Sequence, residues 1–404
     1  MNERALEGLK VLDLTWVVVG PTAIRALADY GATVIKVETG TRVDTARTAG
    51  PFFDGKPGPE SSACFNNANA GKLGLLLNMG VPESQVVLRK LVEWADVMAE
   101  NFTPHVMRRW GLDYESVKAI NPRIIYLSAS MNGQHGPYSN LAAIGNVGAA
   151  IAGLTNSVGW PDRPPAGPGG AYTDYVAAKY ITISLLAALE YRDNTGHGQY
   201  IDLAQAETAI SFMAPSYLDY QESGRLYSPV ANRSYEYAPN GVFPTKGHEQ
   251  WLAISVQDDE QWQQLTDLMG RADLAADESL AHYDGRAAAH DHLTSIISAW
   301  TADKDGQEIE AALIARGVAA HVALDAEQAL SDPQLAHRNH FLPVPHDQWK
   351  QVVVENARFH LERTPPEVKS AAPTFGQHNS EVLSELLGMD DEQIIELAAA
   401  GVFE

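Results

Sequence analysis

Asp174 is the residue whose type and position most clearly allow covalent chemistry. It lies in the segment PGGAYTDYVAAKY, shortly after Gly169 and Gly170, and the apolar spacing from Ala171 to Tyr191 predicts a long helix. A carboxylate in the first turn of a helix is favoured by the helix dipole and the free N–H groups, and preceding glycines let a substrate approach the backbone closely. Aspartate is also common at helix starts for structural reasons alone. On the pattern alone, the structural interpretation of Asp174 is the better supported one.

The cysteine and histidine residues show no pattern typical of a metal or thiol site. Cys64 is the only cysteine, which excludes an intrachain disulfide and any multi-thiolate metal site. His290 and His292 would point to opposite sides of a helix, whereas His337 and His340 have a helical spacing but no third ligand. We therefore expect no metal site, and we expect Cys64 to be a small buried apolar residue.

The composition is that of a globular protein with an acidic surface. Apolar residues make up 45% of the chain and charged residues 20%, without an uninterrupted apolar run long enough to span a bilayer. The segment MNERALEGLK has no apolar signal region, so a cytoplasmic protein without membrane association is expected. The formal net charge of −22 repels polyanions and argues against nucleic acid as a partner. A few local Lys and Arg residues could still bind a small phosphorylated ligand.

Short β-branched runs alternate with helical patterns in the amino-terminal part, which predicts βαβ units on a parallel sheet. The expected strands are Lys10–Val19, Thr33–Glu38, Asp96–Asn101, Ile124–Ser130 and Tyr200–Leu203, and the expected helices are Pro21–Tyr30, Ser84–Trp94, Tyr114–Ile120, Ala171–Tyr191 and Glu207–Glu222. No Gly-x-Gly-x-x-Gly follows the first strand, so a nicotinamide enzyme is disfavoured.

The length allows two domains. We expect a large Rossmann-like domain at 1–222, a linker at 223–237, a small α+β domain at 238–329, and a return segment at 330–404 that packs a closing helix on the large domain. Within the small domain, GVFPTKG and WLAISV predict an antiparallel pair of strands. In the tail, FLPVPHDQW and QVVVENARFHL predict strands, and Ser380–Gly401 predicts an amphipathic helix.

Several sequence segments occur in an order typical of one family. They are LEGLKVLDLT with Gly20 and Pro21, YGATVIKVE, NAGKLGLLLNM, ADVMAENFTPHVMRRWGLDYESVKAINPRIIYLSAS, TGHGQYIDLAQAETA, GVFPTKG and LSDPQLAHRNHF. Through them nearly the whole chain resembles the family III CoA-transferases, which include formyl-CoA transferase, the carnitine CoA-transferases and the α-methylacyl-CoA racemases.

This resemblance implies a Rossmann-like CoA-binding domain, a smaller α+β domain, and two chains interlocked as rings in a homodimer. It implies an enzyme that moves CoA between an acyl-CoA donor and a carboxylic acid acceptor. Coenzyme A would be a substrate, and no cofactor would be permanently bound. Asp174 matches the family's nucleophile, which would carry an aspartyl-CoA thioester. The backbone at Gly169 and Gly170 is a candidate for the oxyanion site.

On the CoA side, the resemblance implies that Val17–Val19 line the pocket through their backbone. Lys72 and Arg109 would hold phosphate groups, and Asn101 with Phe102 would border the adenine or the pantetheine. For lone basic residues, a solvated surface position is the ordinary alternative.

Some positions depart from the family pattern. Val18 stands where formyl-CoA transferase has a glutamine, and the small domain lacks a run of four glycines, so formate and oxalate are disfavoured as substrates. Thr39 replaces a basic residue found in some members after the VIKVE strand, so one phosphate contact would be missing or come from elsewhere. Leu73 and Gly74 replace an Arg-Ser pair.

Two other functions are open. An acyl-CoA racemase or isomerase needs a second base, but Ile144 and Gly145 align with the histidine and aspartate of racemases, and isoleucine cannot move a proton. His135 lies nearby in a loop and is a weak candidate for that base. A non-catalytic acyl-CoA-binding subunit of a hetero-oligomer is the other possibility, although such a subunit would have no need of Asp174. The sequence identifies neither the donor nor the acceptor acid.

Overall fold

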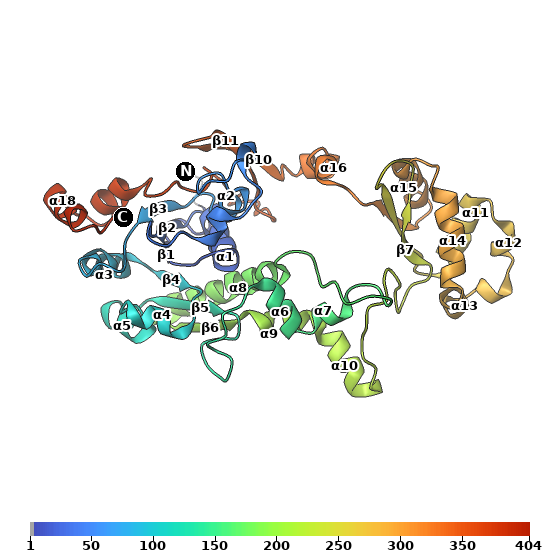
Figure 1. Cartoon of the computed structure of the whole chain (residues 1–404), viewed down its shortest axis with the longest axis horizontal. Coiled ribbons are helices and arrows are strands. Elements are labelled where there is room, and N and C mark those ends of the chain that lie inside the picture. Colours follow the sequence, from blue (N-terminus) through green and yellow to red (C-terminus); the bar gives the residue numbers. More distant parts are fainter. Residues whose placement is uncertain (1–3) are drawn as a thin grey trace. The chain divides into compact units, whose positions relative to one another are not determined.

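The chain divides into two compact units, as the computed structural model of residues 4–404 shows (Figure 1). The larger unit comprises the chain up to Thr155, Gly167–Leu226 and Gln334–Glu404. The smaller unit comprises Asn156–Ala166 and Tyr227–Pro333. Each unit has hydrophobic core residues of its own.

A six-stranded sheet forms the centre of the larger unit, with strand order β3-β2-β1-β4-β5-β6 and parallel pairing throughout. Its strands are β1 (Lys10–Asp13), β2 (Thr33–Glu38), β3 (Leu73–Leu76), β4 (Val97–Glu100), β5 (Ile125–Ser130) and β6 (Tyr200–Ala204). The predicted parallel sheet is therefore confirmed. The strand order reverses between β1 and β4, and open α/β sheets bind ligands at such a switch point.

Alternate residues of the strands face two different cores, as expected for a sheet that helices cover on both sides. Val11 packs with α1 and α8, whereas its neighbour Leu12 packs with α3, α5 and the carboxyl-terminal helices. These covering helices are α1 (Val19–Asp29), α3 (Ser84–Trp94), α5 (Tyr114–Ile120), α8 (Tyr172–Thr195) and α18 (Asp391–Ala399).

The carboxyl-terminal segment covers the edge strand β3. The Gly74 N–H donates to Nδ1 of His378 at 3.0 Å, and the Leu76 N–H donates to Oδ1 of Asn379 at 2.9 Å. These side chains occupy backbone groups that an exposed edge strand would offer to another chain.

The prediction of one continuous helix over Ser380–Gly401 is wrong, because the structure has two separate helical segments there. A π-helical segment, Glu381–Leu386, ends before Gly388, whose φ of 62° interrupts the helix. Asp390 then starts α18 with a capping box, because its side chain accepts from the Gln393 N–H while the Gln393 side chain reaches back.

The other elements of the larger unit and its boundaries are short. They are α2 (Ala63–Ala68), α4 (Pro104–Arg109), α6 (Gly145–Ile151), α7 (Leu154–Ser157), α9 (Gln205–Ile210), α10 (Ala214–Ser223), α17 (Pro333–His337) and the antiparallel pair β10 (Phe341–His346) and β11 (Lys350–Glu355). The two strands predicted in the tail are thus confirmed. The helix predicted for Glu207–Glu222 is divided, because a 3₁₀ turn at Ser211–Met213 separates α9 from α10.

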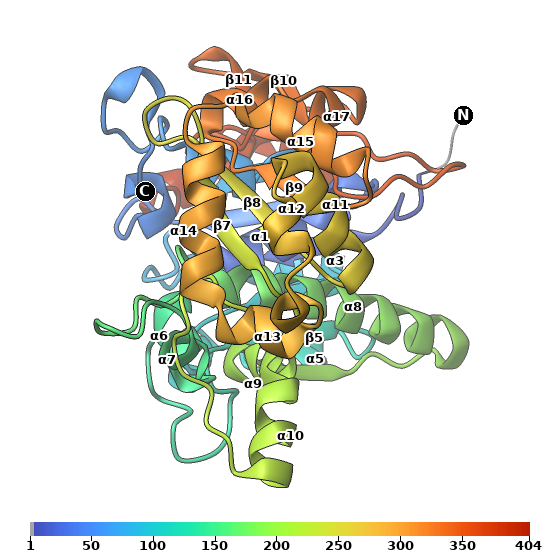
Figure 2. The same cartoon turned by 90° about the vertical axis from the view of Figure 1, so that its right-hand side faces the viewer.

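The smaller unit packs helices around a three-stranded antiparallel sheet of order β7-β8-β9 (Figure 2). Its elements are β7 (Asn240–Pro244), β8 (Trp251–Ser255), β9 (Ala319–Val322), α11 (Asp259–Met269), α12 (Ala272–Ala275), α13 (Tyr283–Ala288), α14 (His290–Thr301), α15 (Gly306–Ile314) and α16 (Ala326–Leu330). Phe243, Leu252, Trp262 and Leu293 lie at the centre of its core. The predicted antiparallel pair is confirmed.

Candidate active site

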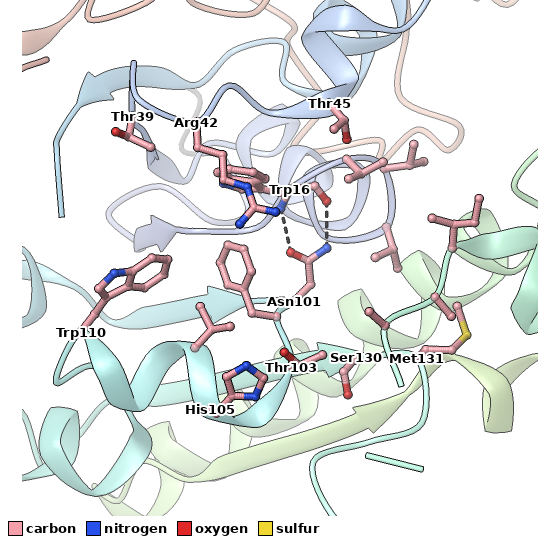
Figure 3. Close-up of a pocket in the computed structure, with 18 of the residues that line it drawn as sticks. Trp16, Thr39, Arg42, Thr45, Asn101, Thr103, His105, Trp110, Ser130 and Met131 are labelled. Atoms are coloured by element: carbon pink, nitrogen blue, oxygen red, sulfur yellow. Dashed lines mark hydrogen bonds between the residues drawn. The ribbon is translucent and has the colours of Figure 1, made fainter. Parts of the chain in front are cut away.

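A cavity of about 800 Å³ opens in the larger unit at the carboxyl edge of the parallel sheet (Figure 3). Residues that follow each of the six strands contribute to its wall. The lining comprises Trp16–Val19 after β1, Thr39, Thr41, Arg42 and Thr45 after β2, Asn78–Gly80 after β3, Asn101–Thr103, His105, Val106, Arg109 and Trp110 after β4, Ser130, Met131 and Leu141–Ile144 after β5, Gln205 after β6, and Asp174. This is the edge at which open α/β sheets bind ligands.

Asp174 lies in the first turn of α8 and is only 7% exposed. Burial raises the pKa of its carboxyl to about 6, although a hydrogen bond from the backbone of Gly145 works in the opposite direction. The sequence suggested a carboxylate stabilised by the helix start, but desolvation outweighs that effect. A partly desolvated carboxylate is a stronger nucleophile than a solvated one and is still ionised at neutral pH.

The start of α6 fixes the position of Asp174. The Thr173 hydroxyl donates to the Gly145 carbonyl at 2.7 Å, and a Cβ built on Gly145 would lie 2.7 Å from Oδ2 of Asp174. The close approach is possible because residue 145 has no side chain. It also leaves no room for the aspartate that racemases carry at this position. Ile144 lines the cavity with an apolar side chain, as its sequence implies.

The loop between β1 and α1 is held in an unusual backbone conformation. Val17 has a φ of 67°, which is rare for a β-branched residue. Its N–H donates to both oxygens of Asp44, at 3.1 and 3.2 Å. Asn101 brackets Trp16, because Oδ1 accepts from the Trp16 N–H and Nδ2 donates to the Trp16 carbonyl, each at 2.8 Å (Figure 3). Val17–Val19 and Asn101, which were predicted to contact CoA, thus line one cavity.

Aromatic and cationic side chains gather beside this loop. The Phe102 ring makes edge contacts with Trp16 and with Trp110, each with 5.6 Å between ring centroids. The Arg42 guanidinium lies 5.6 Å from the Trp16 ring centroid, and Arg109 also lines the cavity. Stacking surfaces and fixed cations together suit a nucleotide with phosphate groups.

Arg42 is a cavity residue that the sequence analysis does not predict. Its signal in the sequence is its position, three residues after Thr39, the residue that replaces a basic one in the family pattern.

Lys72 is not among the residues that line the cavity. Its ammonium is buried and ion-paired with Asp13 at 2.7 Å, and it also donates to the Pro21 carbonyl and to Oδ1 of Asn69. Burial lowers the pKa of Lys72 to about 8, against the opposing effect of Asp13. The other Asp13 oxygen accepts from the N–H and hydroxyl of Thr15, at 2.9 and 2.6 Å. Lys72 thus supports the loop that follows β1, and its ammonium is engaged by protein groups and not presented to the cavity.

Gly169 and Gly170 are exposed and are not among the lining residues, so the structure gives the proposed oxyanion role no support. His135 is also outside the lining. Within residues 4–404, no cluster of three His, Cys, Asp or Glu side chains has the arrangement of a metal site. No helix in the same range is both long and apolar enough to cross a membrane.

Residues 6–379 match the family model described as CoA-transferase family III. The chain belongs to this family. This family III CoA-transferase is 30% identical over 400 residues to succinyl-CoA–D-citramalate CoA-transferase of Chloroflexus aurantiacus, an alignment that covers 99% of the chain and 98% of the relative. It is 32% identical over 385 residues to succinate–glutarate CoA-transferase of Agrobacterium fabrum, covering 94% and 95% of the two chains.

The fold of this CoA-transferase is also that of solved relatives. The crystal structure of a CAIB/BAIF family protein from Brucella suis aligns with a TM-score of 0.86 at 30% identity and covers 95% of this chain and all of that one. The family expected from the sequence segments is therefore confirmed.

Proposed function

We propose that the enzyme transfers CoA from an acyl-CoA donor to a carboxylic acid through covalent intermediates on Asp174. The observation that carries the proposal is the buried carboxylate of Asp174 in the wall of a cavity at the switch point of the sheet. Thioester chemistry does not require a general base beside the nucleophile, because thiolate is a good leaving group and needs no protonation.

In the first half of the reaction, the Asp174 carboxylate attacks the thioester carbonyl and the carbon–sulfur bond breaks. The products are a mixed anhydride on Asp174 and CoA thiolate. The thiolate then attacks the aspartyl carbonyl and expels the donor acid, which leaves an aspartyl-CoA thioester. In the second half, the acceptor carboxylate attacks this thioester, and the released thiolate attacks the acceptor's carbonyl in the new anhydride. A new acyl-CoA leaves and the Asp174 carboxylate is restored.

For CoA itself, we propose that Arg42 and Arg109 contact phosphate groups and that the aromatic cluster of Trp16, Phe102 and Trp110 contacts the adenine. The loop Val17–Val19 would then guide the pantetheine arm toward Asp174. The positions of these groups in one cavity wall support this orientation.

The names of relatives guide the choice of donor and acceptor acids to test. The two relatives described above are named for succinyl-CoA, D-citramalate, succinate and glutarate, which are dicarboxylic acids or a thioester of one. We therefore place succinyl-CoA and these acids at the head of a substrate panel.

We also propose that the enzyme is an intertwined homodimer. The support on this chain is a set of exposed apolar side chains along α8 and the following helices, which a partner would cover: Tyr175, Tyr180, Ile183, Leu186, Phe212 and Leu218. Light scattering on the purified chain tests this, and a monomer at micromolar concentration would contradict it.

Intact mass spectrometry tests the covalent mechanism. The protein is incubated with each acyl-CoA, with and without hydroxylamine, and compared with Asp174→Ala and with Asp391→Ala. Asp391 is a matched control, because it also lies in the first turn of a helix, but is exposed and outside the cavity. An adduct in the native protein and in Asp391→Ala, absent from Asp174→Ala, is expected. If CoA binds and no thioester of the panel labels Asp174, the proposal fails.

A further inference from the structure

Val17 lies in the cavity wall with a backbone conformation that its side chain disfavours. Within residues 4–404, it is the only β-branched residue with a positive φ. In the left-handed region Cβ lies close to a backbone carbonyl oxygen, so a β-branched residue avoids this conformation. A contact with the rest of the protein must therefore hold Val17 in place.

Asp44 supplies such a contact from the segment that follows β2. Its side chain is buried, with the residue only 1% exposed, and both of its oxygens accept from the Val17 N–H. Oδ1 also accepts from the Ala46 N–H at 2.9 Å, which caps the 3₁₀ turn Thr45–Thr48. One carboxylate therefore joins two parts of the cavity wall, the loop after β1 and the segment after β2.

Lys36 holds the same loop from a second point. Its ammonium is fully buried, lies 3.6 Å from Oδ2 of Asp44 and donates to the Thr15 carbonyl. The cation thus offsets the charge of the buried Asp44 carboxylate and also fixes the backbone two residues before Val17. The loop is held on both sides of Trp16 by groups of the protein itself.

The turn that carries Asp44 is anchored independently of this loop. Arg47 lies in that turn, and its buried guanidinium is ion-paired with Glu38 at 2.6 Å and with Glu60 at 2.7 Å. Because these partners belong to β2 and to the segment before α2, the position of Asp44 does not depend on the conformation of Val17. Asp44 is therefore the fixed member of the pair.

We propose that Asp44 is a positioning residue that holds Val17 in the left-handed conformation and so keeps the loop Trp16–Val19 in shape for CoA before CoA arrives. This inference rests on the CoA site proposed above. Without the carboxylate, Val17 would return to a negative φ and the residues that follow it would move. A loop that is already ordered binds its ligand more tightly than one that binding must order.

Calorimetric titration of CoA into the full-length protein tests this role. Asp44→Ala should raise the Kd for CoA about tenfold, which corresponds to the loss of one strained conformation. Adding Val17→Gly to Asp44→Ala should bring the Kd back to within about threefold of the native value, because glycine adopts a positive φ without strain. The second substitution only removes a side chain, so a general loss of structure in Asp44→Ala would become worse and not better.

Asp44→Asn, alone and with Val17→Gly, repeats the comparison with a side chain of nearly the same size and carries the test if Asp44→Ala does not fold. Circular dichroism verifies that each variant is folded at the assay temperature. Asp277→Ala is the matched control, because Asp277 also caps a 3₁₀ turn through the N–H two residues later but lies in the smaller unit, outside the cavity lining. Its Kd should equal that of the native protein.

A native Kd in the folded Asp44 variants would overturn the positioning role. Weakened binding that Val17→Gly does not improve would also overturn it, because Asp44 would then act through another contact. Both outcomes leave the proposed transferase function intact. That function is contradicted instead if the native protein neither binds CoA nor forms an adduct on Asp174.

Discussion

The backbone of Gly145 hydrogen-bonds the carboxylate of Asp174, and a Cβ at position 145 would lie 2.7 Å from Oδ2 of that carboxylate and 3.0 Å from Ala171. Asp174 and the start of α6 are therefore so close that only glycine fits at position 145.

Gly145→Ala should displace the Asp174 carboxylate, because the new methyl group would clash with it. The start of α6 and Ala171 can make room only if their backbone moves. We expect kcat to fall about 100-fold, as displacements near 1 Å commonly do, and the free energy of unfolding to fall by about 1–3 kcal/mol. Gly169→Ala is the control, since a Cβ there meets nothing within 4 Å. Steady-state kinetics and urea unfolding give the two readouts. Equal activity in both variants would show that the contact has no role in catalysis.

The pH dependence of the first half-reaction should report the ionisation of Asp174. Burial raises its pKa to about 6, and only the anion attacks a thioester. Single-turnover formation of the adduct should therefore fall about tenfold per pH unit below pH 6. If the rate of adduct formation instead began to fall only near pH 4, the Asp174 carboxylate would be solvated in the working enzyme.

The raised pKa of Asp174 should make its ionised carboxylate destabilise the folded protein at neutral pH. Its folded pKa lies above the ordinary value of 3.8, so the folded state binds this proton more tightly than the unfolded state. The stabilising effect is present below about pH 4 and is lost as the pH rises to about 6. Asp174→Asn should thus raise the free energy of unfolding by about 1–3 kcal/mol at pH 7 and by much less at pH 4. Asp391→Asn should show no such pH-dependent gain, and a loss of stability at pH 7 in Asp174→Asn would refute the prediction.

Arg42→Gln should weaken acyl-CoA binding without a matching loss in kcat. The exposed guanidinium lines the cavity beside Trp16, so we expect KM for the acyl-CoA to rise about 5- to 20-fold at low salt and less at high salt. Arg89→Gln is the matched control, because Arg89 is an exposed arginine on α3 outside the cavity. An unchanged KM in Arg42→Gln would remove this residue from the proposed phosphate contacts.

Lys72→Met should affect stability first. Removing the ammonium leaves the Asp13 carboxylate buried with one charged partner fewer, which commonly costs about 3–5 kcal/mol. Guanidinium unfolding measures this, and Lys72→Met combined with Asp13→Asn should recover part of the loss. A normal unfolding curve with a raised KM for acyl-CoA would instead restore the phosphate role implied by the sequence.

The sequence predicted the parallel sheet and the family because both depend on local patterns along the chain. Apolar runs such as TVIKVE are buried on both sides of the sheet, and the motif segments lie at the strand ends that form the cavity. The family resemblance proposed roles for Asp174, Arg109 and Asn101, and all three line one cavity.

Contacts between segments far apart in the chain could not be predicted from local sequence patterns. Lys72 follows a glycine in a motif and could be taken for a ligand, but only the fold shows that Asp13, 59 positions away, neutralises it. The close approach of Asp174 to Gly145 at the start of α6 is likewise a contact that the pattern of its own helix does not indicate.

The cover on strand β3 has a consequence for the newly made chain. The Gly74 N–H can pair with His378 only after the ribosome has made the 304 residues up to His378. Until then, the β3 edge of the sheet is uncovered. At about 5–20 residues per second, this interval lasts about 15–60 s. During translation, the amino-terminal half therefore presents an uncovered strand to other nascent chains, and a holding chaperone that binds extended segments would protect it for that period.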